Sequence, residues 1–145
     1  MKKRVLFVCV HNSARSQMAE ALLNRMCADV FEAESAGLEP GSLNRLAVEA
    51  MREIGIDIDG RKTRGVSEVI ESGRTFDYVI TVCDESSAER CPVFPGVAER
   101  VHWNFPDPAN FIGTWEEKLE QTRKVRDAIE SKIEQFCPSG CRAVA

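Results

Sequence analysis

The sequence predicts an α/β fold, a three-layer sandwich with a four-stranded parallel sheet. Segments that favour β-strands alternate along the chain with segments whose apolar residues recur at helical spacing. One of them, residues 76–83, favours β-structure almost throughout, which is typical of a strand covered on both faces. Strands that are joined through helices pair in parallel, and the helices pack against the sheet.

Each expected element has its own signal in the sequence. Strands are expected at residues 5–9, 30–35, 76–83 and 100–105. Helices are expected at residues 15–26, 41–54, 66–71 and 114–136. Thr114 with Glu117 three residues later resembles a capping box, which marks the start of the last helix. The short polar stretch 84–90 is expected to form a helical turn or a mobile loop.

A polar loop follows the first strand and begins with Cys9. Backbone N–H groups at the start of a helix have no intrahelical partner and can bind an oxyanion. Arg15, in the first turn, can add two parallel hydrogen bonds. The positive field of such a loop favours the thiolate of Cys9, which is a nucleophile. The expected oxyanion-binding residues are Val10, His11, Asn12, Ser13, Ala14, Arg15 and Ser16.

A structural interpretation of the same loop is also possible. Cys9 could be a small buried residue that ends a strand, and Arg15 a solvated helix residue, because the Cys-x5-Arg pattern is short. Three features favour the active-site interpretation. They are the strand–loop–helix context, Ser16 directly after the arginine, and the side-chain donors Asn12 and Ser13 within the loop.

Three candidate residues fall at the carboxyl ends of predicted strands, namely Cys9, Cys83 and Asp107. Ligands of parallel sheets bind at this edge, so these residues are expected to lie together. Asp107 is flanked by two prolines and could act as a general acid towards a departing oxygen. It could equally be a turn aspartate that bonds only its own backbone.

The chain has six cysteines, and transient redox chemistry is the expected use of several of them. Without a secretory signal, a structural disulfide framework is not expected. Cys83 could attack a covalent adduct on Cys9, and Cys91 could then resolve the resulting disulfide. The alternative is one buried thiol and one incidental surface thiol. Cys27 is expected in the core, and Cys137 could pair with Cys141.

Length and composition predict one domain, residues 1–137, followed by a flexible tail, residues 138–145. A hydrophobic fraction of 43% and a charged fraction of 29% are ordinary for a soluble globular protein. The net charge of −4 gives no basic surface for nucleic acid. No apolar run approaches the ~20 residues of a membrane span, so a cytoplasmic protein is expected. No Cys-x2-Cys pair is present, and no metal site is predicted.

Several segments resemble arsenate reductases of the low-molecular-weight protein tyrosine phosphatase fold. The resemblance covers about residues 3–136. It is carried by residues 5–9 and 11–20, by Glu34-Ser35-Ala36-Gly37, by residues 79–83 and by residues 102–109. The continuation Ser16-Gln17-Met18-Ala19-Glu20 and the downstream cysteine pair resemble the reductase branch in particular.

The resemblance implies a reaction and a role for each residue. Cys9 would attack arsenate, which Arg15 and the loop amides bind, and Asp107 would donate a proton. Cys83 would attack the Cys9–arsenic adduct, release arsenite and leave a Cys9–Cys83 disulfide. Cys91 would then form a Cys83–Cys91 disulfide on an unwound surface loop.

The same resemblance implies an enzyme without a bound cofactor that needs an external thiol reductant. Thioredoxin fits the cysteine pair, while glutaredoxin with glutathione remains an alternative donor. Phosphate and sulfate would compete with arsenate as oxyanions. A monomer that contacts neither nucleic acid nor membrane is expected.

The sequence also departs from the family pattern. His11 stands where glycine is frequent, Ala14 stands where many members have cysteine, and the Cys83–Cys91 interval is one residue longer than in thioredoxin-coupled members. Some members bind potassium near residues that match Asn12, Glu20 and Ser35. Gly65 stands where a carboxylate ligand is expected.

Two other functions are alternatives to the reductase. A phosphatase of this fold would form a phosphocysteine on Cys9, and the reductase could retain residual activity of this kind. Tyrosine phosphatases of the fold typically have aromatic residues just after the aspartate–proline pair, whereas Ala109 and Asn110 stand here. A noncatalytic oxyanion-binding or redox-sensing module would not produce arsenite over many turnovers.

Overall fold

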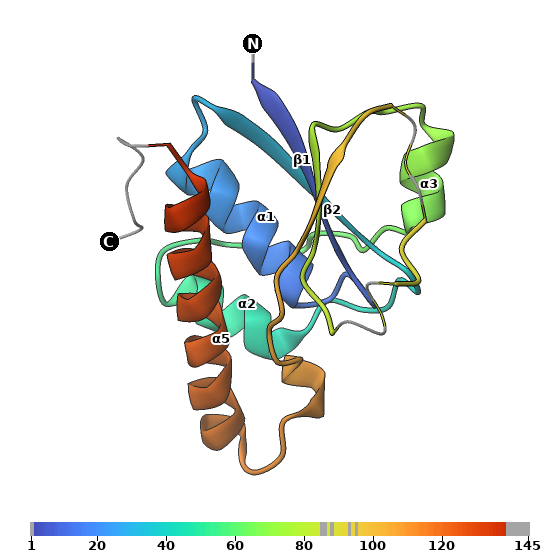
Figure 1. Cartoon of the computed structure of the whole chain (residues 1–145). Helices are drawn as coiled ribbons and strands as arrows, with labels where there is room; N and C mark the ends of the chain where they lie inside the picture. Colours follow the sequence, from blue (N-terminus) through green and yellow to red (C-terminus); the bar gives the residue numbers. More distant parts are fainter. Residues whose placement is uncertain (1, 85–86, 88, 93, 95, 139–145) are drawn as a thin grey trace.

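The computed structural model describes residues 2–84, 87, 89–92, 94 and 96–138. Within these residues it contains the predicted four-stranded parallel sheet (Figure 1). The strands are β1 (Lys3–Cys9), β2 (Phe31–Gly37), β3 (Tyr78–Thr81) and β4 (Glu99–His102). Their order across the sheet is β2-β1-β3-β4, so β1 is central and its carboxyl end lies between those of β2 and β3.

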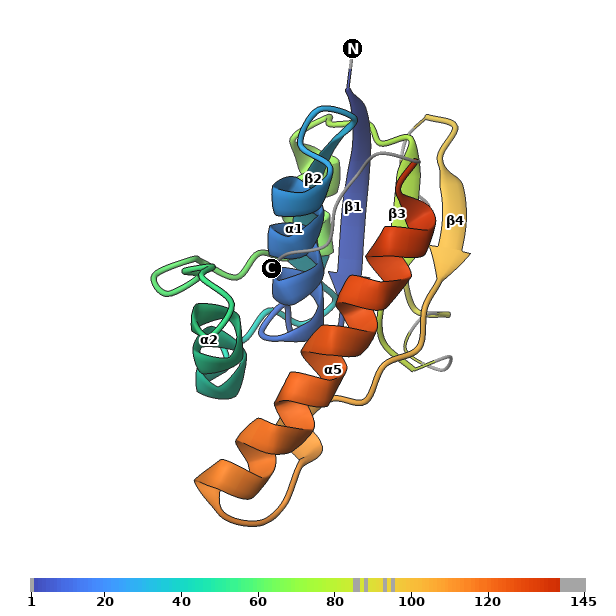
Figure 2. The same cartoon turned by 90° about the vertical axis from the view of Figure 1, so that its left-hand side faces the viewer.

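Helices cover both faces of the sheet and complete the three layers. They are α1 (Arg15–Met26), α2 (Arg45–Arg52), α3 (Val66–Glu71) and α5 (Trp115–Phe136). Figures 1 and 2 show α1 and α5 on one face, with α2 packed beside them, and α3 on the opposite face. No helix among the described residues is long and apolar enough to cross a membrane.

Alternation along β1 divides the core between the two faces. Val5, Phe7 and Cys9 belong to the cluster on the α1/α5 side, whereas Leu6 and Val8 belong to the cluster on the α3 side. All five are buried, as expected for the central strand of a parallel sheet covered on both faces. The sheet is therefore a rigid support for the loop that follows Cys9.

Several boundaries differ from the sequence prediction. Helix α2 begins at Arg45, because the side chain of Asn44 accepts hydrogen bonds from the backbone N–H groups of Leu46 and Ala47. Strand β4 ends at His102, and the chain then leaves the sheet towards the short 3₁₀ helix η1 (Pro108–Asn110). Strand β3 ends at Thr81, two residues before the predicted end. The helices α1, α3 and α5 begin at the predicted residue or one residue later, and the capping box of Thr114 and Glu117 is present.

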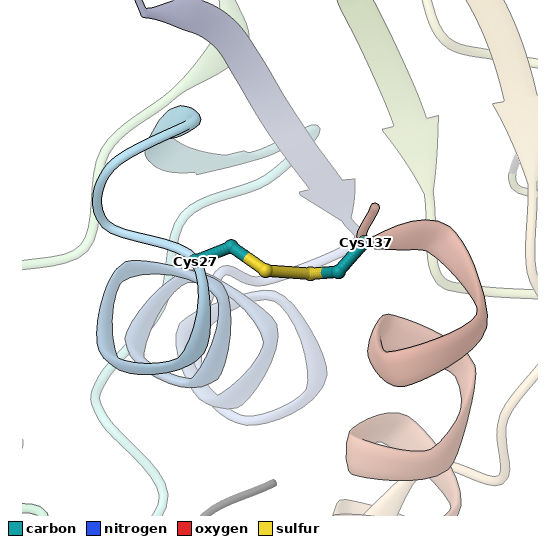
Figure 3. The surroundings of a disulfide bond; sticks show 2 residues. All are labelled: Cys27 and Cys137. Carbon is teal, nitrogen blue, oxygen red and sulfur yellow. A yellow bond between two sulfur atoms is a disulfide. The ribbon is translucent and has the colours of Figure 1, made fainter. Parts of the chain in front are cut away.

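Cys27 and Cys137 form a disulfide, which the sequence analysis did not predict (Figure 3). Cys27 follows α1 and Cys137 follows α5, and their Cα atoms lie 6.6 Å apart. The two helices end close together because both pack on the same face of the sheet. Cys137 is therefore not available to Cys141, which lies outside the described residues together with the rest of the predicted tail, residues 139–145.

Candidate active site

Cys9 ends β1, and its sulfur receives two contacts from the loop and helix that follow. The Oγ atom of Ser16 lies 2.8 Å from Cys9 Sγ, and the backbone N–H of Asn12 donates to the same sulfur at 3.2 Å. Ala14, the residue that caps α1, has no side-chain acceptor, so the first N–H groups of the helix receive no side-chain cap. The loop therefore combines the Cys9 thiol with backbone N–H donors at the start of α1.

Asn12 holds this geometry from inside the loop. It is fully buried and adopts φ 55°, the left-handed region that asparagine tolerates better than most residues. Its Nδ2 donates to Ser16 Oγ at 2.8 Å, which leaves the hydroxyl hydrogen of Ser16 free to point at Cys9 Sγ. That direction supplies a hydrogen-bond donor to the sulfur.

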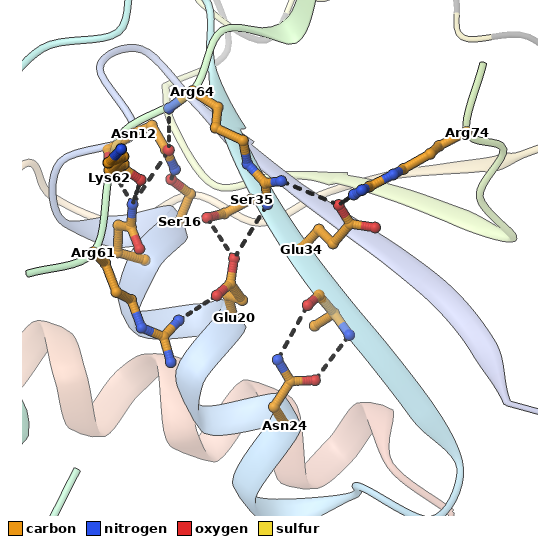
Figure 4. A network of polar contacts seen from close by, with 12 residues as sticks. Asn12, Ser16, Glu20, Asn24, Glu34, Ser35, Arg61, Lys62, Arg64 and Arg74 are labelled. Carbon is orange, nitrogen blue, oxygen red and sulfur yellow. Dashed lines mark hydrogen bonds and ion pairs between the residues drawn. The ribbon is translucent and has the colours of Figure 1, made fainter. Parts of the chain in front are cut away.

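A second segment holds Asn12 in turn, as Figure 4 shows. The backbone N–H of Arg64 donates to Asn12 Oδ1 at 2.9 Å. The side chain of Gln17 donates to the backbone and side-chain oxygens of Asn12 and to the carbonyl of Lys62. Residues 61–64 therefore act as a support for the catalytic loop, and sequence reasoning did not identify them.

Ion pairs fasten this support to α1 and β2. Glu20 of α1 pairs with Arg61 and Arg64 and accepts a hydrogen bond from Ser35 Oγ at 2.8 Å. Glu34 of β2 pairs with Arg64 at 3.3 Å and also with Arg74 (Figure 4). Among the described residues, no group of three or more His, Cys, Asp or Glu side chains is arranged to hold a metal ion.

Gly37 supports the loop from the end of β2, by a close approach that only glycine permits. A Cβ atom at this position would lie 2.7 Å from Asn12 N and 2.8 Å from Val10 O. The next residues run along the loop, since Leu38 N donates to Cys9 O and Glu39 N donates to Val10 O. In the sequence, this glycine was noted only as part of the segment Glu34-Ser35-Ala36-Gly37 that carries the family resemblance.

Arg15 lies beneath the loop and joins it to the Asp107 segment. Its side chain is 6% exposed, its Nη1 donates to Phe105 O at 3.2 Å, and its Nη2 lies 3.2 Å from Asp107 Oδ2. Asp107 Oδ1 also accepts a hydrogen bond from Ala109 N at 3.0 Å. Asp107 therefore bonds its own backbone, but not only its own backbone, because it also pairs with Arg15; its role as a general acid stays a prediction.

The remaining loop residues differ in exposure. Val10 is partly buried, Ala14 is buried, and the ring of His11 is exposed with Nδ1 2.8 Å from Glu39 O. Ser13 contributes its carbonyl oxygen, which accepts a hydrogen bond from Asn44 N at 2.8 Å. These residues form the loop that follows Cys9. The His11 ring contacts Glu39, and the contact of Ser13 is made by its backbone.

Cys83 lies just beyond β3 and belongs to the same buried cluster as Cys9. Burial raises the pKa of the Cys83 thiol to about 11, an effect that the positive charge of Arg15 opposes and a negative charge on Cys9 increases. Both charges act on Cys83 because the three residues gather at one edge of the sheet. Arg15, whose charge acts on Cys83, also pairs with Asp107, which is consistent with the expected juxtaposition of Cys9, Cys83 and Asp107.

Cys91 lies elsewhere. It is buried in the cluster on the α3 side of the sheet, with Leu6, Val8 and Phe94, whereas Cys83 is on the α1/α5 side. Burial raises the pKa of the Cys91 thiol, and Arg100 opposes that shift. Cys91 is therefore not an exposed thiol, and it does not lie beside Cys83. Part of the predicted polar stretch between the two cysteines, residues 85, 86 and 88, lies outside the described residues.

Cys83 is expected to be alkylated more slowly than Cys9. In the reduced protein, its alkylation by iodoacetamide should accelerate about tenfold per pH unit above neutrality and level off only near its pKa of about 11. Peptide mapping after timed alkylation measures this profile. A plateau below pH 9 would contradict the effect of burial.

Replacing Ser16 by alanine is expected to slow the alkylation of Cys9 at pH 7 by about tenfold, since a hydrogen bond to a charged group contributes about 1.5 kcal/mol or more. The sulfur would lose its contact with Ser16 Oγ and keep the one with Asn12 N. Ser87→Ala is a control outside the loop, and it should leave Cys9 alkylation unchanged. An unaltered rate in the Ser16 variant would show that the hydroxyl does not stabilise the thiolate.

Comparison with known proteins places this geometry in a family. Residues 4–144 match the family described as low molecular weight phosphotyrosine protein phosphatase. The chain belongs to this family. Within it, the chain is 42% identical over 139 residues to an arsenate reductase of Halalkalibacterium halodurans, with 96% of this chain and 98% of the relative covered.

Solved structures of this phosphatase family give the same result. The crystal structure of arsenate reductase from Archaeoglobus fulgidus DSM 4304 is 38% identical, with a TM-score of 0.62, and the match covers 86% of this chain and 98% of that one. A thioredoxin-dependent arsenate reductase of Corynebacterium glutamicum is 28% identical, with a TM-score of 0.64, and the match covers 94% of this chain and 64% of that one. The fold and the family resemblance inferred from the sequence are confirmed.

Proposed function

We propose that this protein is an arsenate reductase that converts arsenate to arsenite through a thiol relay. The observation that carries the proposal is the second thiol: Cys83 lies in the same buried cluster as Cys9, next to Arg15. A phosphatase of this fold needs one nucleophilic cysteine, whereas a two-electron reduction needs two thiols. The curated relatives of similar length are arsenate reductases, which supports the same assignment.

The first steps consume the two thiols at the sheet edge. Loop amides and Arg15 bind arsenate, and Cys9 thiolate attacks arsenic while one oxygen leaves as water after protonation. Cys83 then attacks Cys9 Sγ. A sulfur–sulfur bond forms, the sulfur–arsenic bond breaks with its electron pair left on arsenic, and arsenite departs. The two electrons gained by arsenic come from the two thiols, which become a disulfide.

The charges at the site favour this order of attacks. Burial is the main cause of the raised pKa of Cys83, Arg15 opposes it, and a negative charge on Cys9 raises that pKa further. Once Cys9 is bonded to arsenic, the contribution of its charge is gone, while that of Arg15 remains. The first attack therefore removes one of the effects that disfavour the Cys83 thiolate.

Asp107 is the proposed proton donor for the departing oxygen. Arg15 and the N–H of Ala109 both contact its carboxylate. An oxyanion that takes over the guanidinium of Arg15 frees Asp107 from its ion pair. The carboxyl can then carry the proton that the leaving oxygen needs.

Cys91 completes the relay by attacking Cys83, which releases Cys9 and leaves a Cys83–Cys91 disulfide. An external dithiol then reduces that disulfide, and thioredoxin is the proposed donor, as in the named relative from Corynebacterium glutamicum. Glutaredoxin with glutathione is the alternative. The proposed relay requires no bound cofactor. We propose a cytoplasmic location, because a reducing compartment supplies such donors. A monomer is proposed as well.

The decisive experiment is steady-state NADPH consumption with thioredoxin, thioredoxin reductase and arsenate, for the wild type and the Cys9→Ser, Cys83→Ser and Cys91→Ser variants. Turnover in the wild type and its loss in all three variants is expected. Ser87→Ala serves as a control and should retain full turnover. If the wild type fails to turn over arsenate but hydrolyses an aryl phosphate efficiently, the protein is a phosphatase acting through Cys9.

A further inference from the structure

The structure holds Cys91 away from its proposed partner, so the relay needs a release step. Cys91 is buried on the α3 side of the sheet and Cys83 on the α1/α5 side. A disulfide requires the two sulfur atoms to approach to about 2 Å. The backbone that carries Cys91 must therefore move before the second exchange can occur.

Two arginines restrain this backbone. Arg100 of β4 donates from Nη2 to Cys91 O at 3.3 Å. Arg90, the residue before Cys91, donates from Nη2 to Glu39 Oε2 at 2.5 Å. The first bond ties Cys91 to the neighbouring strand, while the second reaches across to a different part of the molecule.

Glu39 belongs to the segment that lies against the catalytic loop. Its backbone N–H donates to Val10 O at 2.7 Å, and its carbonyl lies 2.8 Å from His11 Nδ1. The hydrogen bond and charge of Arg90 hold the pKa of the Glu39 carboxyl below its usual range, with a smaller contribution from His11. Glu39 therefore carries a full negative charge at neutral pH and links the catalytic loop to the residue before Cys91.

We propose that the Glu39–Arg90 ion pair is a latch: it keeps Cys91 out of reach of Cys83 until Cys91 attacks the Cys9–Cys83 disulfide. This inference rests on the proposed function, which assigns Cys91 its place in the relay. Both side chains are about half exposed, at 58% for Glu39 and 52% for Arg90. Exposed pairs of this kind are weak, so the latch opens readily during turnover while it still lowers the population of the released state.

The test is the alkylation rate of Cys91 in the reduced full-length chain, followed by peptide mapping. Glu39→Gln is expected to speed Cys91 alkylation about two- to fivefold, the range that an exposed ion pair supports. Asp59→Asn is the matched control, because it weakens another exposed ion pair, Arg45–Asp59, which involves neither Glu39 nor Arg90. The double variant Glu39→Arg/Arg90→Glu restores the pair with exchanged charges and should return the rate towards that of the wild type.

Three outcomes separate the latch from the proposed function. Equal Cys91 alkylation in Glu39→Gln and the wild type overturns the latch, as does a double variant that is as fast as Glu39→Gln. Faster alkylation in Glu39→Gln, together with no arsenate turnover in the wild type, supports the latch and rejects the reductase. In a reductase, single-turnover formation of the Cys83–Cys91 disulfide should accelerate in Glu39→Gln by the same factor as alkylation.

Discussion

Replacing Arg15 by lysine is expected to lower kcat/KM for arsenate by about 10²–10³-fold, comparable to the loss of one donor from an oxyanion site. Lysine keeps the positive charge but not the planar fork of donors. In this structure the fork contacts two partners at once, Phe105 O and Asp107 Oδ2. A single ammonium group cannot keep the contact with Phe105 O while also presenting two parallel bonds to an oxyanion.

The comparison that checks this prediction is steady-state kinetics of Arg15→Lys beside Arg25→Lys. Arg25 lies in the last turn of the same helix, and its Nη2 donates to Gly55 O at the surface. It should show wild-type kinetics. If Arg15→Lys retained more than about a third of the wild-type activity, charge alone would account for oxyanion binding, and the fork geometry would not be needed.

The parts of the site that sequence analysis predicted are those set by local interactions. Cys9, Arg15 and Ser16 fall within eight residues, where a buried strand turns into a helix, and that change of period is visible in the sequence. The capping box of Thr114 and Glu117 is local in the same way. The sheet edge could also be predicted, because parallel strands bring their carboxyl ends together.

The parts that it did not predict depend on contacts between distant segments. Gly37 is needed because its Cα packs on the backbone of Asn12, and nothing next to Gly37 in the sequence reveals that contact. The support from Arg64 reaches across 52 residues to Asn12. Cys91 follows Cys83 by only eight residues, yet the two belong to clusters on opposite faces of the sheet. Short sequence separation does not place two residues on one face.

The Cys27–Cys137 disulfide is the clearest correction, and its physical reason is similar. An argument from the cellular compartment gave no reason to expect a structural disulfide, and such an argument applies to a class of proteins rather than to one pair of cysteines. Packing of α1 and α5 on one face brings the two helix ends together, across 110 residues of chain. Both cysteines are buried, which limits the access of a protein reductant to the bond.

Removing this disulfide with the double variant Cys27→Ser/Cys137→Ser is expected to lower the free energy of unfolding by about 2–5 kcal/mol. The bond closes a long loop, so its loss enlarges the conformational freedom of the unfolded chain. The melting temperature should fall by roughly 10 °C, as a change of this size does in a domain of this length. The double variant is preferred to Cys137→Ser, because it leaves no unpaired Cys27 to react elsewhere.

Urea unfolding of the wild type and the double variant, with and without a small-molecule thiol, measures the effect and controls for it. Reductant should destabilise the wild type once the bond is cleaved and leave the double variant unchanged, so that the two converge. Arsenate turnover at 25 °C should be alike in both, because the disulfide and the catalytic loop lie at opposite ends of α1. If the oxidised wild type and the double variant unfold at the same urea concentration, the bond does not stabilise the fold, and the packing of α5 alone holds the end of the helix in place.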